Sequence, residues 1–306
     1  MTEHMTETDI IVDFMKTCTV EVTPGGAAKI ESFPEILRAG TTVYVTFLPG
    51  SDFADTVKTV RRLRDEGMAP VPHFAARSIP SRDFLEENLK MLQGECAVEE
   101  ALLIGGGVDN PVGEFHCSMQ VLETGLFEKY GIKKLGVAGH PEGSPDISSH
   151  DIADAIRQKN DFARETNAEM ALVTQFAFNA ETMITWAEKL AAEGNTLPVH
   201  LGLAGPAKLT TLLKYAAMCG VGASLGFLKK RAGAIAALTT SYSPDQMMDP
   251  IEAYWQANPD GPVAQVHVFP FGGLKKTAEY LTERGNWFDA PVADNNNDPA
   301  QQEVVQ

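Results

Sequence analysis

The stretch Glu169-Met-Ala-Leu-Val-Thr-Gln-Phe-Ala-Phe178 decides the fold class. Its apolar residues form an almost unbroken run, which is typical of a strand covered on both faces in a parallel sheet. Gln175 interrupts the run near its carboxyl end, and a buried amide without partners costs roughly 1–3 kcal/mol. A primary amide has two donors and two acceptor lone pairs, so Gln175 suits either a heterocyclic ligand or neighbouring backbone. This stretch alone favours the backbone.

Strand and helix patterns alternate along the rest of the chain. Seven further strands are predicted at residues 18–24, 42–47, 71–75, 101–104, 135–139, 199–203 and 265–269. Helices are predicted at residues 27–37, 52–67, 81–92, 119–130, 148–164, 180–193, 207–218, 225–239 and 274–283. About eight repeats predict an α/β fold, a single-domain (β/α)8 TIM barrel over residues 13–289. Residues 1–12 are expected to be flexible and residues 290–306 to form a disordered tail.

An open, doubly wound parallel sheet is the competing architecture. It is disfavoured because no glycine-rich phosphate-binding pattern follows the first strand. The repeat number also favours the barrel.

The overall charge and the cysteines restrict the function. The formal net charge of -16 disfavours nucleic acid and anionic membrane surfaces as partners. No apolar run is long enough to span a bilayer, and the residues after Met1 lack a secretory pattern, so a cytoplasmic protein is expected. The four cysteines show no C-x-x-C spacing, which favours reduced thiols. Whether the chain forms a homo-oligomer stays open.

A TIM barrel carries its active site at the carboxyl ends of its strands. The residues expected there share a polar or backbone-exposing character, and they are Glu21, Thr46, His73, Gly105 to Gly107, His140, Gln175, His200 and Phe271 to Gly273. Glu21 is the one carboxylate among them, which suits a general acid. A structural hydrogen bond between Glu21 and the hydroxyl of Thr19 or Thr23 is the alternative.

The remaining motifs argue against several kinds of chemistry. The histidines lack metal-ligand spacing, so no metal site is predicted. The triplet Gly105 to Gly107 lacks the ending of a phosphate loop and favours close approach of the backbone to a flat ring. No nucleophile motif is present, and an acid beside a ligand pocket therefore favours chemistry supplied by a cofactor.

These residues resemble those of the methylenetetrahydrofolate reductases, which are FAD-dependent (β/α)8 barrels. The most specific match is Thr174-Gln-Phe-Ala-Phe-Asn179, which is similar to the family's T-Q-F-F-F-D. Pro72-His-Phe74, Val20-Glu-Val-Thr-Pro24, Val45-Thr-Phe47 and His140-Pro-Glu142 are similar to its P-H-L, F-E-F-F-P-P, V-T-Y and Y-P-E segments. The resemblance runs from about Thr19 to Leu281.

The resemblance implies a role for each matching residue. Glu21 would be the acid that protonates folate N10, and reduced flavin would then deliver hydride to give 5-methyltetrahydrofolate. NADH or NADPH would be the partner in the interconversion with 5,10-methylenetetrahydrofolate. The implied FAD-binding residues are Thr46, Phe47, His73, Gly105, Gly106, Gly107, His116, Cys117, His140, Asp151, Arg157 and Lys159. The implied substrate-binding residues are Gln175, Phe178, Tyr215 and Asp109.

The chain also departs from the family pattern. The family's R-G-D after the fourth strand is Gly105-Gly-Gly107 here, and its arginine after the eighth strand falls at Gly273. Without a carboxylate near the flavin, the reduced anionic flavin is less disfavoured, so we expect methyl oxidation to be the favoured direction. A related FAD barrel that oxidises another N-methyl or cyclic amine, and a ligand-binding barrel without catalysis, are the two alternatives.

Overall fold

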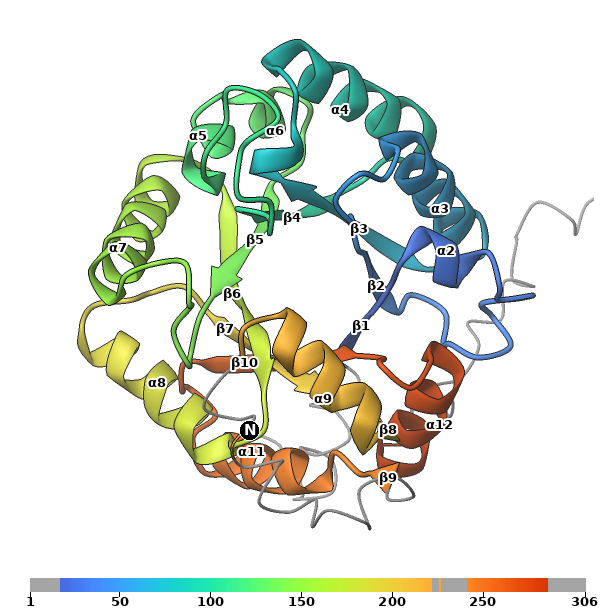
Figure 1. Cartoon of the computed structure of the whole chain (residues 1–306), viewed down its shortest axis with the longest axis vertical. Coiled ribbons are helices and arrows are strands. Elements are labelled where there is room, and N and C mark those ends of the chain that lie inside the picture. Colours follow the sequence, from blue (N-terminus) through green and yellow to red (C-terminus); the bar gives the residue numbers. More distant parts are fainter. Residues whose placement is uncertain (1–16, 222–225, 227–240, 286–306) are drawn as a thin grey trace, which may run out of the picture.

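The protein is a closed barrel of eight parallel strands surrounded by helices, as Figure 1 shows. The computed structural model describes residues 17–221, 226 and 241–285. Neighbouring strands follow the order β1-β10-β7-β6-β5-β4-β3-β2 around the barrel. The predicted TIM barrel is confirmed. The predicted domain limits at residues 13 and 289, the flexible 1–12 and the tail 290–306 lie outside the described residues.

All eight predicted barrel strands are present. They are β1 (Thr19–Val22), β2 (Thr42–Val45), β3 (Ala69–Ala75), β4 (Glu100–Ile104), β5 (Lys134–Gly139), β6 (Glu169–Ala177), β7 (Val199–Ala204) and β10 (Val263–Phe269). Two short strands, β8 (Ala207–Lys208) and β9 (Ser241–Tyr242), form a separate antiparallel sheet.

Three long helices begin at the residues that the sequence indicates. Asp52 caps α3 (Phe53–Asp65), Ser81 caps α4 (Arg82–Cys96) and Ser148 caps α7 (Ser149–Glu165), each by accepting a backbone N–H with its side-chain oxygen. The other helices are α2 (Pro24–Ala27), α5 (Ser118–Leu122), α6 (Leu126–Lys129), α8 (Ala180–Ala192), α9 (Leu209–Met218), α11 (Asp245–Ala257), α12 (Leu274–Gly285) and the 3-10 helix η1 (Ala76–Ser78).

Several helix predictions were wrong. The helix expected at residues 27–37 does not form, because the single turn α2 already ends at Ala27 and most of residues 28–37 are turn or bend. The helix expected at residues 119–130 is divided into α5 and α6 at Gly125, whose φ of 69° is left-handed. Helix α11 was missed, since Pro250 in its interior argues against a helix. The helix predicted at 225–239 lies outside the described residues, apart from Gly226.

Side-chain alternation along the strands separates an outer shell from the barrel interior. The outward residues of β1 and β2, such as Val20, Val22 and Val43, are buried in the large core beneath the helices. The inward residues form a smaller apolar cluster of Tyr44, Val71, Leu102 and Val173. This inner cluster meets the polar interior through Tyr44, whose ring contacts those of His73 and His267.

In the described part of the chain, no helix combines the length and the apolar character needed to cross a membrane.

Candidate functional site

Glu21 faces the barrel interior from β1 and contacts a buried histidine. Its Oε2 atom lies 3.5 Å from Nε2 of His267 on β10, and the Nδ1 atom of the same ring lies 2.8 Å from Oγ1 of Thr19. The side chain of Glu21 is 14% exposed and that of His267 is 1% exposed. The carboxyl group is therefore open to a ligand, whereas the imidazole beneath it is enclosed by protein.

Tyr44 lies beside this histidine and extends the polar interior toward β4. Its ring makes an edge contact with the His267 ring at a centroid distance of 4.6 Å. Its hydroxyl donates a 2.9 Å hydrogen bond to Glu100, whose pKa is raised by burial. Burial also raises the pKa of Tyr44 well above its usual range. The pair therefore places a second carboxyl group in the interior, bonded to the tyrosine.

Three polar side chains close to this centre have buried atoms without a hydrogen-bond partner in the described structure. They are Oγ1 of Thr46 after β2, both ring nitrogens of His73 on β3, and Nδ1 of His200 on β7. Burial lowers the pKa of His73 to about 4 and that of His200 to about 4. Both rings are therefore neutral near pH 7, and each has one donor and one acceptor. Because unpaired buried polar atoms are costly, a polar ligand is the natural partner.

The glycine triplet after β4 borders a cavity of about 310 Å3. Gly106 has a φ of 90°, and a Cβ there would lie 3.2 Å from the Cβ of Ala75, so this position requires glycine. The carbonyl of Gly105 accepts a 3.0 Å bond from the backbone of Arg77. Gly107, Asp109 and His116 line the cavity, with Arg77, Pro111 and Asp146. Three predicted residues, Gly107, Asp109 and His116, are thus brought to one cavity.

His140, Lys159 and Cys117 lie near one another beside the exit of β5. The Lys159 ammonium donates a 2.9 Å bond to the carbonyl oxygen of Ala138, and burial lowers its pKa to about 8. Burial and this lysine together lower the pKa of His140. Cys117 is exposed and its charge would act on Lys159. The three predicted residues therefore form one electrostatically coupled group.

Gln175 lines a cavity of about 70 Å3 with His140, Glu142 and Cys219. Its Oε1 atom accepts a 3.1 Å bond from the backbone N–H of Phe176. The backbone interpretation therefore holds for the amide oxygen. No bond of the amide nitrogen is described, so the ligand interpretation stays a prediction.

The two predicted aromatic substrate-binding residues belong to a chain of ring contacts. Tyr215 on α9 stacks on Phe271 at a centroid distance of 4.4 Å and is 36% exposed. Phe178 is buried and contacts Phe176 and Tyr242 edge-on. Tyr215 therefore presents an exposed ring, whereas Phe178 belongs to the packing beneath it.

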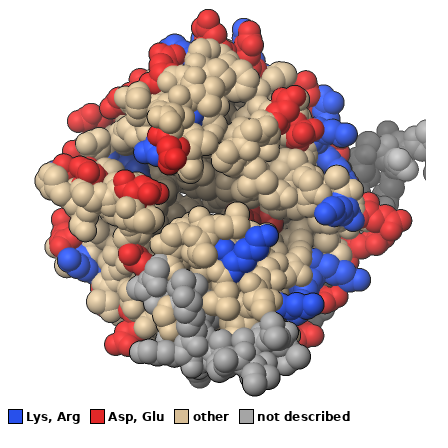
Figure 2. Space-filling model, in the orientation of Figure 1, with Lys and Arg blue, Asp and Glu red and all other residues tan. Residues whose placement is uncertain are grey.

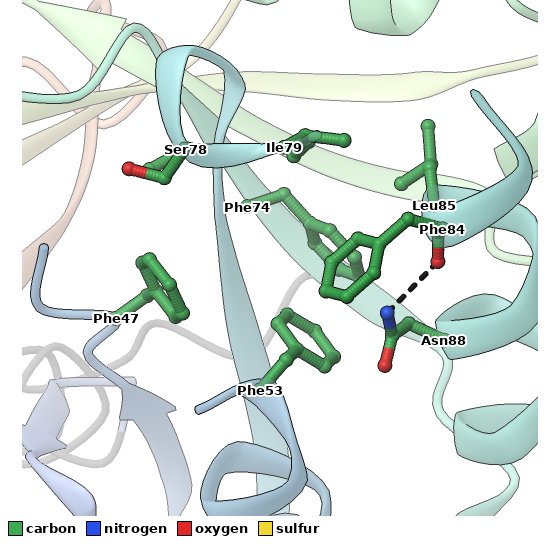
Figure 3. A pocket seen from close by; sticks show the side chains of 9 residues that line it. Phe47, Phe53, Phe74, Ser78, Ile79, Phe84, Leu85 and Asn88 are labelled. Atoms are coloured by element: carbon green, nitrogen blue, oxygen red, sulfur yellow. Dashed lines mark hydrogen bonds between the residues drawn. The ribbon is translucent and has the colours of Figure 1, made fainter. Parts of the chain in front are cut away.

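Three predicted cofactor-binding residues have other neighbours. Phe47 packs against Phe53 and lines a nearly filled apolar pocket outside the barrel strands (Figure 3). Asp151 accepts a 2.7 Å bond from Ser148 at the start of α7. Arg157 is 69% exposed and pairs with Asp154. Local packing or pairing accounts for each, and their cofactor roles stay predictions.

Sequence reasoning missed Tyr44, Glu100 and His267 as components of the site, and Thr19, expected as a partner of Glu21, is paired with His267 instead. Alternation in the eighth strand, Gln265-Val-His-Val-Phe269, was the available signal, because it turns His267 to the same side as Gln265 and Phe269. The proximity of β10 to β1, with Thr19 opposite His267, follows only from closure of the barrel.

The face shown in Figure 2 is hollowed at its centre, and charged residues are scattered around the hollow. No set of three His, Cys, Asp or Glu side chains among the described residues is arranged to hold a metal ion.

One comparison with a solved structure supports the fold. No family model matches the sequence. An uncharacterised protein from Clostridium thermocellum that binds two copies of 5-methyl-5,6,7,8-tetrahydrofolic acid superimposes with a TM-score of 0.57 and is 11% identical. The match covers 89% of this chain and 94% of that one. The DHPS of Yersinia pestis, solved with a pterine-sulfa conjugate, has a TM-score of 0.46 and 13% identity over 90% and 96% of the two chains.

Proposed function

We propose that the protein is a flavin-dependent oxidoreductase that interconverts 5,10-methylenetetrahydrofolate and 5-methyltetrahydrofolate, with FAD as cofactor and NADH or NADPH as partner. The observation that carries the proposal is the position of Glu21. It is a partly exposed carboxyl group inside the barrel, whereas Glu100, the other interior carboxyl group described above, is hydrogen-bonded to Tyr44. This is the arrangement that a single general acid requires.

The residues around the mouth fit a flavin at three places. Thr46 and His73 have buried polar atoms without partners, which suit the polar edge of a ring. At Gly105 and Gly107 a Cβ would meet no heavy atom within 4 Å, so a flat group can approach the backbone closely there. Lys159 has a buried ammonium with one described bond, to Ala138, and could hold a phosphate. The adjoining cavity of about 310 Å3 falls within the ordinary range of small-molecule sites.

The residues of this chain would then have distinct tasks. A bound flavin would supply the hydride chemistry. Glu21 would donate its proton to N10 of the folate as the ring of the methylene form opens, and take it back in the oxidative direction. Gln175 would orient the substrate through its amide nitrogen. The exposed ring of Tyr215 would stack on the flat part of the folate or nicotinamide.

The choice of folate as the substrate to test first rests on one solved structure. The Clostridium thermocellum protein shares the fold and binds 5-methyltetrahydrofolate, which makes this compound the first ligand to test. The absence of the family's arginine at Gly273 removes one folate contact that the resemblance implies. The exposed Lys275 and Lys276 follow in the chain and offer a replacement charge.

A visible spectrum and an anaerobic titration test the proposal. The purified protein, loaded with FAD if necessary, is expected to absorb as a flavoprotein, and 5-methyltetrahydrofolate should bleach it under anaerobic conditions. Parallel titrations with NADH and NADPH would identify the partner. A colourless protein that does not take up FAD contradicts the flavin assignment. A flavoprotein that other N-methyl amines bleach, but not 5-methyltetrahydrofolate, contradicts the folate assignment.

The Glu21→Gln variant tests the acid. It is expected to lose turnover by roughly 10²- to 10⁴-fold, the usual contribution of a general acid. Glu100→Gln is the matched control, because Glu100 is also a carboxyl group of the barrel interior but is bonded to Tyr44. Equal losses in both variants would indicate that Glu21 has only a structural role.

A further inference from the structure

The imidazole of His267 is held in one orientation by contacts on every side. Its Nδ1 atom lies 2.8 Å from Oγ1 of Thr19. The ring of Tyr44 packs against it at 4.6 Å, and the ring of Phe269 at 4.8 Å with an interplanar angle of 86°. The residue is 1% exposed. The ring therefore cannot turn without displacing aromatic side chains.

The partner of Nδ1 determines which nitrogen carries the proton. A neutral imidazole has one N–H, and the hydroxyl of Thr19 can donate as well as accept. When Thr19 donates to Nδ1, the proton of the ring lies on Nε2, which faces Oε2 of Glu21 at 3.5 Å. In the opposite tautomer Nε2 has only a lone pair, so it would accept the proton of the Glu21 carboxyl group and compete with the folate for it. The first arrangement pairs all three groups.

We propose that His267 is a positioning residue for Glu21, and that Thr19 fixes the His267 tautomer in which Nε2–H points at the carboxyl group. The proposal rests on the proposed function, in which Glu21 is the acid. The Nε2–H bond limits the rotation of the Glu21 carboxyl group, so that one oxygen faces His267 and the other faces the open mouth. A donor on β10, in register with Thr19, thus directs the catalytic group.

Other ionisable groups surround Glu21 and His267, and their charges influence any measurement made on the two residues. Tyr44 and Glu100 lie on the β2 and β4 side, His73 lies on β3, and His200 lies on β7. A positive charge on His267 would lower the pKa of His73 and of His200, so these histidines lie within electrostatic range. Cys219, after α9, lies within range of Glu21, whose charge raises the pKa of its thiol in addition to the effect of burial.

The test combines histidine NMR with kinetics on the full-length chain. In ¹⁵N-histidine-labelled protein, the His267→Gln variant identifies the His267 signals by their loss. In the wild type, the spectrum is expected to show the proton of His267 on Nε2. In the Glu21→Gln variant, the ¹⁵N resonance of this nitrogen should shift. In the Thr19→Val variant, His267 should no longer adopt a single tautomer. The Thr19→Ser variant keeps the hydroxyl and should restore the wild-type spectrum.

Kinetic measurements separate an effect on turnover from an effect on substrate binding. Thr19→Val should lower kcat roughly 10- to 100-fold, as misplacement of a catalytic group does, and leave the Kd for 5-methyltetrahydrofolate nearly unchanged. Thr19→Ser should keep the wild-type kcat, because it retains the hydroxyl. A kcat that is lost in Thr19→Val but kept in Thr19→Ser depends on the hydroxyl and not on folding stability alone.

The two measurements separate failure of this inference from failure of the proposed function. If the protein turns over no folate, the NMR spectra still decide whether His267 and Glu21 are coupled. The positioning role is overturned if the wild-type His267 carries its proton on Nδ1 alone. It is also overturned if the ¹⁵N resonances of His267 are the same in Glu21→Gln as in the wild type. A Thr19→Val variant that keeps wild-type kcat in an active enzyme overturns it as well.

Discussion

The Nζ atom of Lys159 donates a 2.9 Å hydrogen bond to the carbonyl oxygen of Ala138, and no other bond of this buried ammonium is described. Burial lowers the pKa of Lys159 to about 8. The unfolded chain therefore holds this proton between about pH 8 and the ordinary lysine pKa, whereas the folded chain has lost it. By linkage, this lysine makes the folded state gain stability as the pH rises through that window, and it costs stability at pH 7.

We therefore expect Lys159→Met to raise the stability of the ligand-free protein at pH 7 by about 1–3 kcal/mol. The same variant should bind FAD more weakly, because the ammonium is the charge proposed to meet a phosphate. Thermal unfolding and FAD titration measure the two effects. Arg164→Met is the matched control, since Arg164 lies on the same helix but is exposed and paired with Asp161. Undiminished FAD affinity in Lys159→Met would remove this residue from the cofactor site.

The buried His73 makes a prediction about acid sensitivity. Burial lowers its pKa to about 4, so between about pH 6.5 and 4 the unfolded chain carries a proton that the folded chain lacks. Stability is expected to fall as the pH drops through this window. His73→Leu should reduce this pH dependence and weaken ligand binding at pH 7, where the ring is neutral. Denaturation curves measured at several pH values check the slope, and His150→Leu, an exposed histidine, is the control.

The sequence predicted the strands better than the connections between them. Buried parallel strands have a local apolar signature, and all eight were located. Helix boundaries at Asp52, Ser81 and Ser148 were also predictable, because the capping side chain acts on its own helix. The division of one expected helix at Gly125 depends on a left-handed backbone residue that periodicity does not reveal.

The candidate site was predictable only in part for a related reason. Strand alternation predicts that Glu21 faces inward, but it does not predict which strand will supply its neighbour. His267 meets Glu21 across 246 residues because the barrel closes between β1 and β10. The pairing of Arg157 with Asp154 on the same helix is likewise a local contact that the sequence analysis did not anticipate.

Gly107 provides a test of the expected reaction direction. A Cβ at this position meets no heavy atom within 4 Å, and its φ does not lie in the left-handed region, so a side chain is accommodated. In the FAD-loaded protein, Gly107→Asp is expected to lower the flavin midpoint potential by on the order of 20–60 mV through repulsion of the reduced anion. Gly107→Asn has nearly the same size without the charge and is the control. An unchanged potential in Gly107→Asp would mean that this loop does not approach the flavin.

The hydrogen bond from Tyr44 to Glu100 is expected to stabilise the folded protein. Tyr44→Phe removes the donor and leaves the carboxyl group of Glu100 unpaired, where burial already raises its pKa. We expect a loss of roughly 1–3 kcal/mol in the free energy of unfolding, the usual penalty for an unsatisfied buried polar group.

Tyr130→Phe is the matched control for this prediction. It removes a tyrosine hydroxyl that donates at 2.8 Å to Glu86, but this carboxyl group also pairs with the exposed Lys129 at the surface. Water and the lysine replace the lost donor there, so the expected loss is small. Urea denaturation of the two variants measures the difference. Equal losses of unfolding free energy in the two variants would show that the interior of the barrel admits enough water to solvate Glu100. In that case, the double variant Tyr44→Phe/Glu100→Gln should be no more stable than Tyr44→Phe alone.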